Sequence, residues 1–153
     1  MLIPATEIEK VVYTAKAHTT GGLDGGAFRT SDGHLDVKLS VPGSSGTSTN
    51  PEQLFAVGWS ACFLSAIKLV AARKKVKLPA DVAIYTQVDL GMTSSGYLLQ
   101  ARLNVGLPGL EPGVAQTVVD DAHLECPYSK ATRGNIEVAT AVITARNASV
   151  GSE

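Results

Sequence analysis

The sequence is short of several residue types, and each shortage argues against a class of protein. Only two cysteines, Cys62 and Cys126, occur among 153 residues, too few for a disulfide-rich secreted scaffold. Aromatic residues make up 5% of the chain, which argues against a stacking platform for nucleic-acid bases. Lys and Arg number 13 against 14 Asp and Glu, so there is no basic excess with which to bind a polyanion. We therefore expect no nucleic-acid partner.

The amino-terminal residues 1–10 lack a cationic start followed by an apolar run, so no secretory signal is visible. We expect a cytoplasmic protein, in a compartment where a lasting structural disulfide is unusual. Two thiols there are inert core residues, metal ligands or redox groups. The composition, 44% hydrophobic and 18% charged, is that of a folded chain, and the length fits a single domain over residues 1–153.

One long apolar segment needs an interpretation. Residues 54–72 are almost wholly apolar over nearly the length of a membrane span. Ser60, Ser65 and Lys68 interrupt the run, and no second segment resembles it. These features favour a buried helix of a soluble protein, and we expect no membrane partner.

The residues before this segment carry a helix-start signal. The run from Thr49 to Glu52 supplies a cap, a proline and a carboxylate, which predicts a helix from about residue 50 to residue 75. Because this helix is apolar nearly all round, a domain of this size cannot enclose it alone. We expect two chains to pack around a pair of such helices.

Alternating apolar residues predict several strands and turns. The strands are expected at residues 11–17, near 28, and at 37–41, 82–90, 97–105 and 136–142, with turns at 31–33 and 91–96. A second helix follows Pro112 with an apolar face of Val114, Val118, Val119 and Ala122. A short helix over residues 127–133 ends at Gly134. The sum is an α+β fold with antiparallel hairpins and few βαβ units.

The two cysteines lie in different local settings. Cys62 is in the middle of the long helix, where apolar surroundings raise a thiol pKa unless a cation or donor is added. Cys126 precedes Pro127 at the expected N-cap of the short helix, where backbone N–H groups and the helix dipole lower a thiol pKa. Each alone is more typical of a structural cysteine. The two can meet if the second helix packs against the long one.

Glu52 is the third candidate residue. It precedes Cys62 by ten positions, about 15 Å along a helix axis. Its position alone is typical of a helix N-terminal charge. It cannot easily serve the thiol of its own helix, so a thiol on which it acts would belong to another chain.

Other kinds of site are poorly supported. His123 and Cys126 form the only closely spaced pair of soft ligands, which is too few for a structural zinc site. The sequence contains neither a phosphate-binding loop nor a Gly-x-Ser-x-Gly nucleophile elbow. We expect no metal and no bound cofactor.

Both cysteines lie in longer motifs. The first reads Asn-Pro-Glu-Gln-Leu-Phe-Ala over residues 50–56 and then Ser-Ala-Cys-Phe over residues 60–63. The second is His123 followed by Cys-Pro-Tyr-Ser-Lys-Ala-Thr-Arg-Gly-Asn over residues 126–135. In order and spacing these motifs resemble the organic hydroperoxide resistance proteins, the Ohr branch of the OsmC/Ohr superfamily. The resemblance covers roughly residues 8 to 145.

The resemblance implies a fold and an activity. The fold is one of antiparallel sheets around a long buried central helix, in an intertwined homodimer with active sites at the interface. The activity is that of a thiol peroxidase for alkyl and fatty-acid hydroperoxides in oxidative-stress defence. Cys62 would be the peroxidatic cysteine, Cys126 the resolving cysteine, and Glu52 an orienting group from the partner chain. The external reductant would be a dihydrolipoyl dithiol on a lipoylated protein.

The sequence departs from the family pattern at one position. The family's turn carries an arginine after two glycines, and that arginine pairs with the peroxidatic thiolate. Here Leu23 follows Gly21 and Gly22, which predicts a raised Cys62 pKa and a slower first step. Arg29 and Arg133 are alternative cations.

Two other functions stay open beside the peroxidase. One is a related protein that binds or senses a hydrophobic ligand, with peroxidase activity weakened by Leu23. The other is a hydrolase in which Cys62 is an acylated nucleophile.

Overall fold

The computed structural model describes residues 6–146 of the chain. Contacts within the chain divide it into two compact units, Met1–Asn50 and Pro51–Glu153. The expectation of one domain over the whole sequence stays a prediction.

The first unit contains a small antiparallel sheet in the order β1-β2-β3. Its strands are β1 (Ala17–Thr20), β2 (Ala27–Thr30) and β3 (Asp36–Lys38). The glycine-rich segment between β1 and β2 is a tight turn, because a Cβ on Gly26 would lie 1.8 Å from the Gly22 carbonyl oxygen. The turn between β2 and β3 falls at residues 31–33, as predicted.

Two strand predictions in this unit are wrong in extent. Residues 11–16 form no strand, and Val12 is 90% exposed. These residues alternate in polarity but do not pair with a neighbouring strand, so β1 begins only at Ala17. The strand predicted over residues 37–41 ends at Lys38, after which Leu39 makes an isolated bridge to Thr49.

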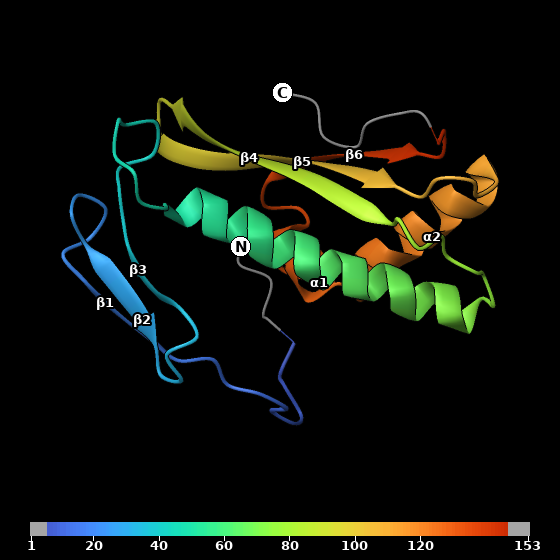
Figure 1. The fold of residues 1–153 in the computed structure, drawn as a ribbon, viewed down its shortest axis with the longest axis horizontal. Helices are drawn as coiled ribbons and strands as arrows, with labels where there is room; N and C mark the ends of the chain where they lie inside the picture. Colours follow the sequence, from blue (N-terminus) through green and yellow to red (C-terminus); the bar gives the residue numbers. More distant parts are fainter. Residues whose placement is uncertain (1–5, 147–153) are drawn as a thin grey trace. The chain divides into compact units, whose positions relative to one another are not determined.

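The second unit combines helices with a mixed sheet in the order β4-β5-β6. Its elements are α1 (Pro51–Arg73), β4 (Ala83–Thr93), β5 (Gly96–Gly106), α2 (Pro112–Glu125), α3 (Pro127–Thr132) and β6 (Glu137–Ile143). Strands β4 and β5 are antiparallel, whereas β5 and β6 are parallel. A parallel pair needs a crossover, and α2 and α3 supply it. Figure 1 shows α1 running along the sheet, and α1 also packs on α2.

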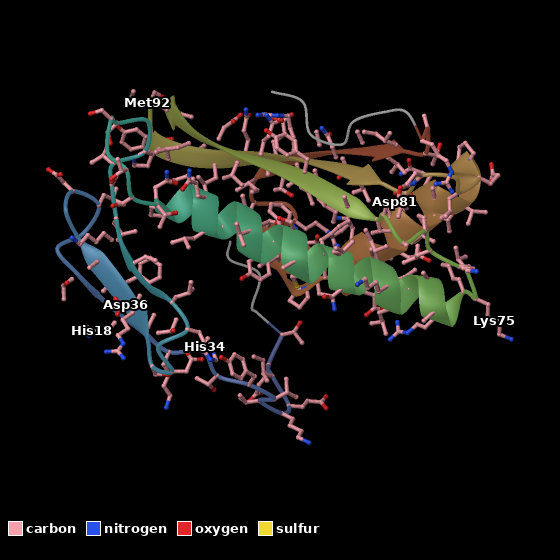
Figure 2. The ribbon with its side chains drawn as sticks, viewed as in Figure 1. His18, His34, Asp36, Lys75, Asp81 and Met92 are labelled. Atoms are coloured by element: carbon pink, nitrogen blue, oxygen red, sulfur yellow. The ribbon has the colours of Figure 1, made fainter. Side chains whose placement is uncertain are left out.

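The β4–β5 hairpin is longer than predicted. Gly91 pairs with Leu98, and the strands continue until Thr93 pairs with Gly96. The turn is therefore two residues long rather than the predicted 91–96, because Gly91 takes part in the strand pairing. Figure 2 shows Met92 near the tip of this hairpin.

The core of the second unit lies between the helices and the sheet. Trp59, Phe63 and Ile67 of α1, Leu103 and Val105 of β5, and Val118 and Val119 of α2 are fully buried. The predicted apolar face of α2 is corrected at one position, because Ala115 is buried whereas Val114 is 39% exposed. Residues 115, 118, 119 and 122 follow the i, i+3, i+4, i+7 spacing of a single helix face.

The long helix α1 closely matches the prediction. It begins at Pro51 and ends at Arg73, and Lys75 beyond it adopts a φ of 56° (Figure 2). Among residues 6–146, α1 is the one helix long and apolar enough to cross a membrane by length and composition. One face of it forms the core, while Val57 is 69% exposed and Leu69 45% exposed. The second unit therefore does not by itself enclose α1. The expected packing of two chains around a pair of such helices stays a prediction.

Candidate active site

The packing of α1 on α2 brings the two thiols together. Cys62 lies midway along α1, and Cys126 lies at the corner where α2 ends and α3 begins. Although 64 positions separate them in sequence, the Sγ atoms are 3.6 Å apart and the Cys126 thiol donates to Cys62. A disulfide needs about 2.05 Å between its sulfur atoms, so the two thiols are in contact but not bonded. The conditional prediction that the cysteines meet is confirmed.

The two thiols differ in accessibility. Cys126 is completely buried, whereas Cys62 is partly exposed. Of these two thiols, Cys62 is therefore the one that a reagent can reach from solvent.

Burial raises the pKa of the Cys62 thiol, and the neighbouring Cys126 thiol raises this pKa further. The main-chain N–H of Tyr128 acts in the opposite direction. This is the direction predicted from the sequence. Within residues 6–146, no guanidinium is among the groups that shift this pKa.

The two candidate cations belong to different units, Arg133 to the unit that holds both thiols and Arg29 to the other. Arg133 donates a hydrogen bond to the main-chain carbonyl of His123. Leu23, where the resemblance leads one to expect an arginine, is 43% exposed in the unit Met1–Asn50. Arg29 belongs to the same unit, as an exposed residue of β2.

Glu52 lies in the first turn of α1, as predicted, and is partly buried. Its Oε2 atom is shielded from solvent and has no hydrogen-bond partner among the described residues. A buried carboxylate oxygen without a donor is costly, so this oxygen is free to accept a hydrogen bond.

Aromatic side chains lie along the same stretch of α1. The Phe55 ring is 5.5 Å from that of Trp59 and 6.2 Å from that of Tyr128, between centroids. Gly58 lies one helical turn before Cys62, and a Cβ there would be 2.9 Å from the Tyr128 hydroxyl. The absence of a side chain at Gly58 therefore lets α3 approach α1 closely beside Cys62.

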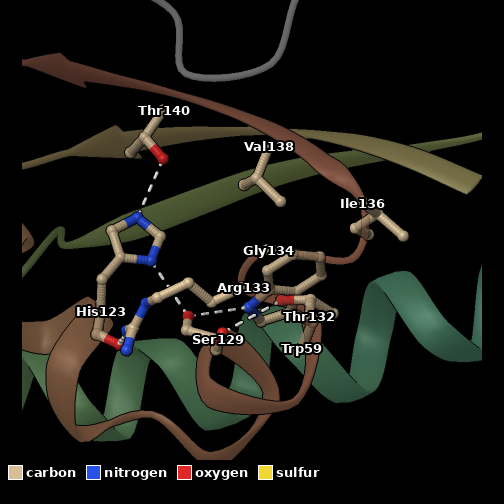
Figure 3. A pocket seen from close by; sticks show the side chains of 9 residues that line it. All are labelled: Trp59, His123, Ser129, Thr132, Arg133, Gly134, Ile136, Val138 and Thr140. Atoms are coloured by element: carbon tan, nitrogen blue, oxygen red, sulfur yellow. Dashed lines mark hydrogen bonds between the residues drawn. The ribbon is translucent and has the colours of Figure 1, made fainter. Parts of the chain in front are cut away.

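A polar network beside the thiols was missed by the sequence analysis. His123 Nδ1 is 3.0 Å from Ser129 Oγ, and its Nε2 is 2.9 Å from Thr140 Oγ1 (Figure 3). Burial lowers the pKa of His123, and the charge of Arg133 lowers it further. Both ring nitrogens bond to hydroxyl groups, so the imidazole is not directed at Cys126 as a metal ligand. In the part of the chain that the structure describes, no group of three or more His, Cys, Asp or Glu side chains could hold a metal.

A small pocket adjoins this network. Its volume is about 320 Å³, and its lining includes Trp59 and His123 together with Ile136 and Val138 of the chain around β6 (Figure 3). His123 carried a sequence signal through its spacing to Cys126, and Ser129 lies within the second cysteine motif, whereas Thr140 carried none.

This geometry defines a class of site, a pair of adjacent free thiols in an α+β fold. Residues 43–141 match the family described as OsmC-like protein. The chain is 51% identical over 134 residues to the organic hydroperoxide resistance protein of Xanthomonas axonopodis pv. citri, covering 85% of this chain and 94% of that protein. It is 38% identical over 132 residues to the organic hydroperoxide resistance protein OhrA of Bacillus subtilis, covering 83% and 93%.

Solved structures agree with these relatives. An organic hydroperoxide resistance protein from Legionella pneumophila has 42% identity and a TM-score of 0.82, covering 88% of this chain and 99% of that one. OhrB of Bacillus subtilis has 39% identity and a TM-score of 0.81, covering 86% and 99%. The chain belongs to the OsmC/Ohr family, which confirms the resemblance drawn from the cysteine motifs and the predicted α+β, OsmC/Ohr-like fold. The intertwined homodimer stays a prediction.

Proposed function

We propose that this protein reduces organic hydroperoxides through Cys62 and Cys126, as a defence against oxidative stress. The observation that carries the proposal is the 3.6 Å separation of the two sulfurs, one partly exposed and the other buried. Relatives named organic hydroperoxide resistance proteins cover most of the chain and support the same activity.

In the first step, the Cys62 thiolate attacks the terminal oxygen of R–O–O–H. The O–O bond breaks, the alkoxide takes a proton and leaves as the alcohol R–OH, and Cys62 becomes a sulfenic acid. We assign this role to Cys62 because it is partly exposed, whereas Cys126 is buried. The raised pKa of Cys62 makes its thiolate scarce at neutral pH, which slows this step.

In the second step, the Cys126 sulfur attacks the Cys62 sulfenic acid. The S–O bond breaks, water leaves with the thiol proton, and a disulfide forms. Together the two thiols supply the two electrons that reduce the peroxide. The Cys126 thiol already donates to Cys62, so the attack needs little movement.

Completing the cycle requires an external dithiol, which we take to be a dihydrolipoyl group on a lipoylated protein in the cytoplasm. We further propose that the working unit is a homodimer. The exposed apolar residues of α1, with Val57 at 69%, favour a covering chain. The unpartnered Glu52 oxygen favours an orienting role for this carboxylate at a site shared between chains.

The substrate class follows from the surroundings of Cys62. Phe55 and Tyr128 present rings beside this part of α1. Burying an alkyl chain gains about 0.8 kcal/mol per methylene, a term that hydrogen peroxide lacks. Alkyl and fatty-acid hydroperoxides are therefore the expected substrates.

The test mixes reduced protein with one equivalent of an alkyl hydroperoxide or of hydrogen peroxide. We expect a rapid loss of two protons in the intact mass with the alkyl substrate, and a much slower change with hydrogen peroxide. Cys62→Ser should show neither. Thiols that stay reduced for minutes with the alkyl substrate would contradict the proposal.

Two observations favour a second function. The raised pKa of Cys62 and the leucine at position 23 are both expected of a protein that binds or senses a hydrophobic ligand. Such a protein would hold its ligand equally well after Cys62→Ser, whereas a peroxidase would lose its reaction.

A further inference from the structure

Ser129 connects two helices at the corner that carries Cys126. Its hydroxyl oxygen accepts the indole N–H of Trp59 in α1 at 3.3 Å and lies 3.0 Å from His123 Nδ1 in α2. The side chain itself belongs to α3 and is only 4% exposed. A single hydroxyl thus links α3 to both longer helices.

His123 extends the link to the sheet. Its Nε2 lies 2.9 Å from the Thr140 hydroxyl of β6, and its ring packs 4.4 Å from that of Phe63, between centroids. One arrangement satisfies every group: the Ser129 hydroxyl donates to Nδ1, and the Nε2 proton is donated to Thr140. Phe63 is the neighbour of Cys62, so the network reaches the helix of the other thiol.

Cys126 lies between these two anchors. It follows His123 by three residues and precedes Ser129 by three, about one helical turn each. Its main-chain N–H donates to Ala122 at 2.9 Å and its carbonyl accepts from Lys130 at 3.0 Å, while its side chain makes no capping bond. The direction of the sulfur is therefore set by the α2–α3 corner as a whole.

Hydrogen bonds link the side chains on one side of this corner. Trp59, His123 and Ser129 all line the pocket of about 320 Å³. The hydrogen bonds of Ser129 to Trp59 and His123 therefore help to fix the orientation of these side chains beside the pocket.

We propose that Ser129, held by His123 and Trp59, is a positioning residue that keeps the Cys126 sulfur aimed at Cys62. The inference rests on the proposed function, because it concerns the second step, in which Cys126 displaces water from the Cys62 sulfenic acid. Loss of the hydroxyl should slow that step and leave the attack of Cys62 on the hydroperoxide unchanged.

The experiment compares Ser129→Ala with Ser129→Thr, which keeps a hydroxyl. Reduced protein is mixed with one equivalent of an alkyl hydroperoxide and quenched at millisecond intervals. Intact mass separates thiol, sulfenic acid trapped with dimedone, and disulfide. For Ser129→Ala we expect the fully reduced protein to disappear at an unchanged rate, because Cys62 still reacts with the hydroperoxide. Disulfide formation should be slower by about tenfold, and trapped sulfenic acid should accumulate. Ser129→Thr should restore most of the rate.

Two further variants complete the design. Ser95→Ala removes an exposed serine hydroxyl in the turn between β4 and β5, where it lies 3.0 Å from the Thr93 hydroxyl, and it should leave both steps unchanged. Trp59→Phe removes the indole donor while keeping an aromatic side chain, and it should slow disulfide formation by a smaller factor. It also provides the measurement if Ser129→Ala does not fold.

Several results would overturn the inference. Disulfide formation at the wild-type rate in Ser129→Ala or, if that variant does not fold, in Trp59→Phe would do so. An equal slowing of both steps would also overturn it. So would a decrease in the rate of disulfide formation in Ser129→Thr as large as that in Ser129→Ala. A wild-type protein that forms no disulfide would instead defeat the proposed function, so the two failures are distinguishable.

Discussion

The two cysteines are held in place by different kinds of structure. Cys62 lies within the 23-residue helix α1, whose backbone hydrogen bonds fix its position regardless of distant residues. Cys126 lies at a corner between two helices, where contacts to α1 and β6 pass through Ser129 and His123. A thiol that meets substrate can thus be placed by local structure. A thiol that must meet another thiol depends on tertiary contacts.

Replacing each cysteine separately should give the largest difference. Cys62→Ser should lower turnover of an alkyl hydroperoxide by on the order of a thousandfold or more, because the nucleophile is gone. Cys126→Ser should allow one oxidation, after which excess peroxide converts the sulfenic acid to a sulfinic acid. Mass spectrometry of peroxide-treated protein measures both. Retained turnover in Cys62→Ser would reverse the assigned roles.

Leu23→Arg tests whether an added cation lowers the pKa of Cys62. If the family arrangement holds, the added guanidinium should lower the pKa of Cys62. Each decrease of this pKa by one raises the thiolate fraction at pH 7 about tenfold. Stopped-flow measurement of thiol loss reports the rate. Leu23→Met is the uncharged control, and an equal rate in the two variants would mean that another residue supplies the cation.

The raised pKa of Cys62 predicts the pH dependence of the first step. Since the thiolate is the nucleophile and the pKa lies above its ordinary value of 9.0, the rate of Cys62 oxidation should rise about tenfold per pH unit between pH 7 and 9. In Cys126→Ser the profile should shift to lower pH, because the Cys126 thiol contributes to raising this pKa. A flat profile would show that the thiolate is already formed at pH 7.

The close approach of α3 to α1 is tested by Gly58→Ala. Alanine ordinarily stabilises a helix by about 1 kcal/mol relative to glycine, but here the Cβ would lie 2.9 Å from the Tyr128 hydroxyl. We expect thermal unfolding at or below the wild-type temperature. Adding Tyr128→Phe should recover part of the loss, and a more stable Gly58→Ala alone would refute the tight contact.

The smallest effect concerns His123. Its pKa is lowered in the folded protein, so the unfolded chain binds the proton more tightly. Stability from this group is present above the unfolded pKa of about 6.5 and is lost as the pH falls through the lower folded value. Urea unfolding from pH 7.5 to 5 measures the slope. His123→Gln should flatten it, and an unchanged slope would assign it to other groups.

The sequence by itself determined the helices and the family. The cap and proline before α1, the proline that opens α2 and the Cys-Pro break before α3 act within a few residues, so local chemistry was sufficient to predict them. Cys62, Cys126 and Glu52 also lie in the elements expected for them, because their motifs carry the spacing.

Only the tertiary structure decided which residues meet. The alternation at residues 11–16 predicted a strand, yet a strand needs a neighbour and β1 begins at Ala17. The 3.6 Å contact between sulfurs 64 positions apart, and the hydroxyl of Ser129 between two helices, arise from the packing of α1 on α2. Such packing depends on long-range burial, which no local pattern encodes.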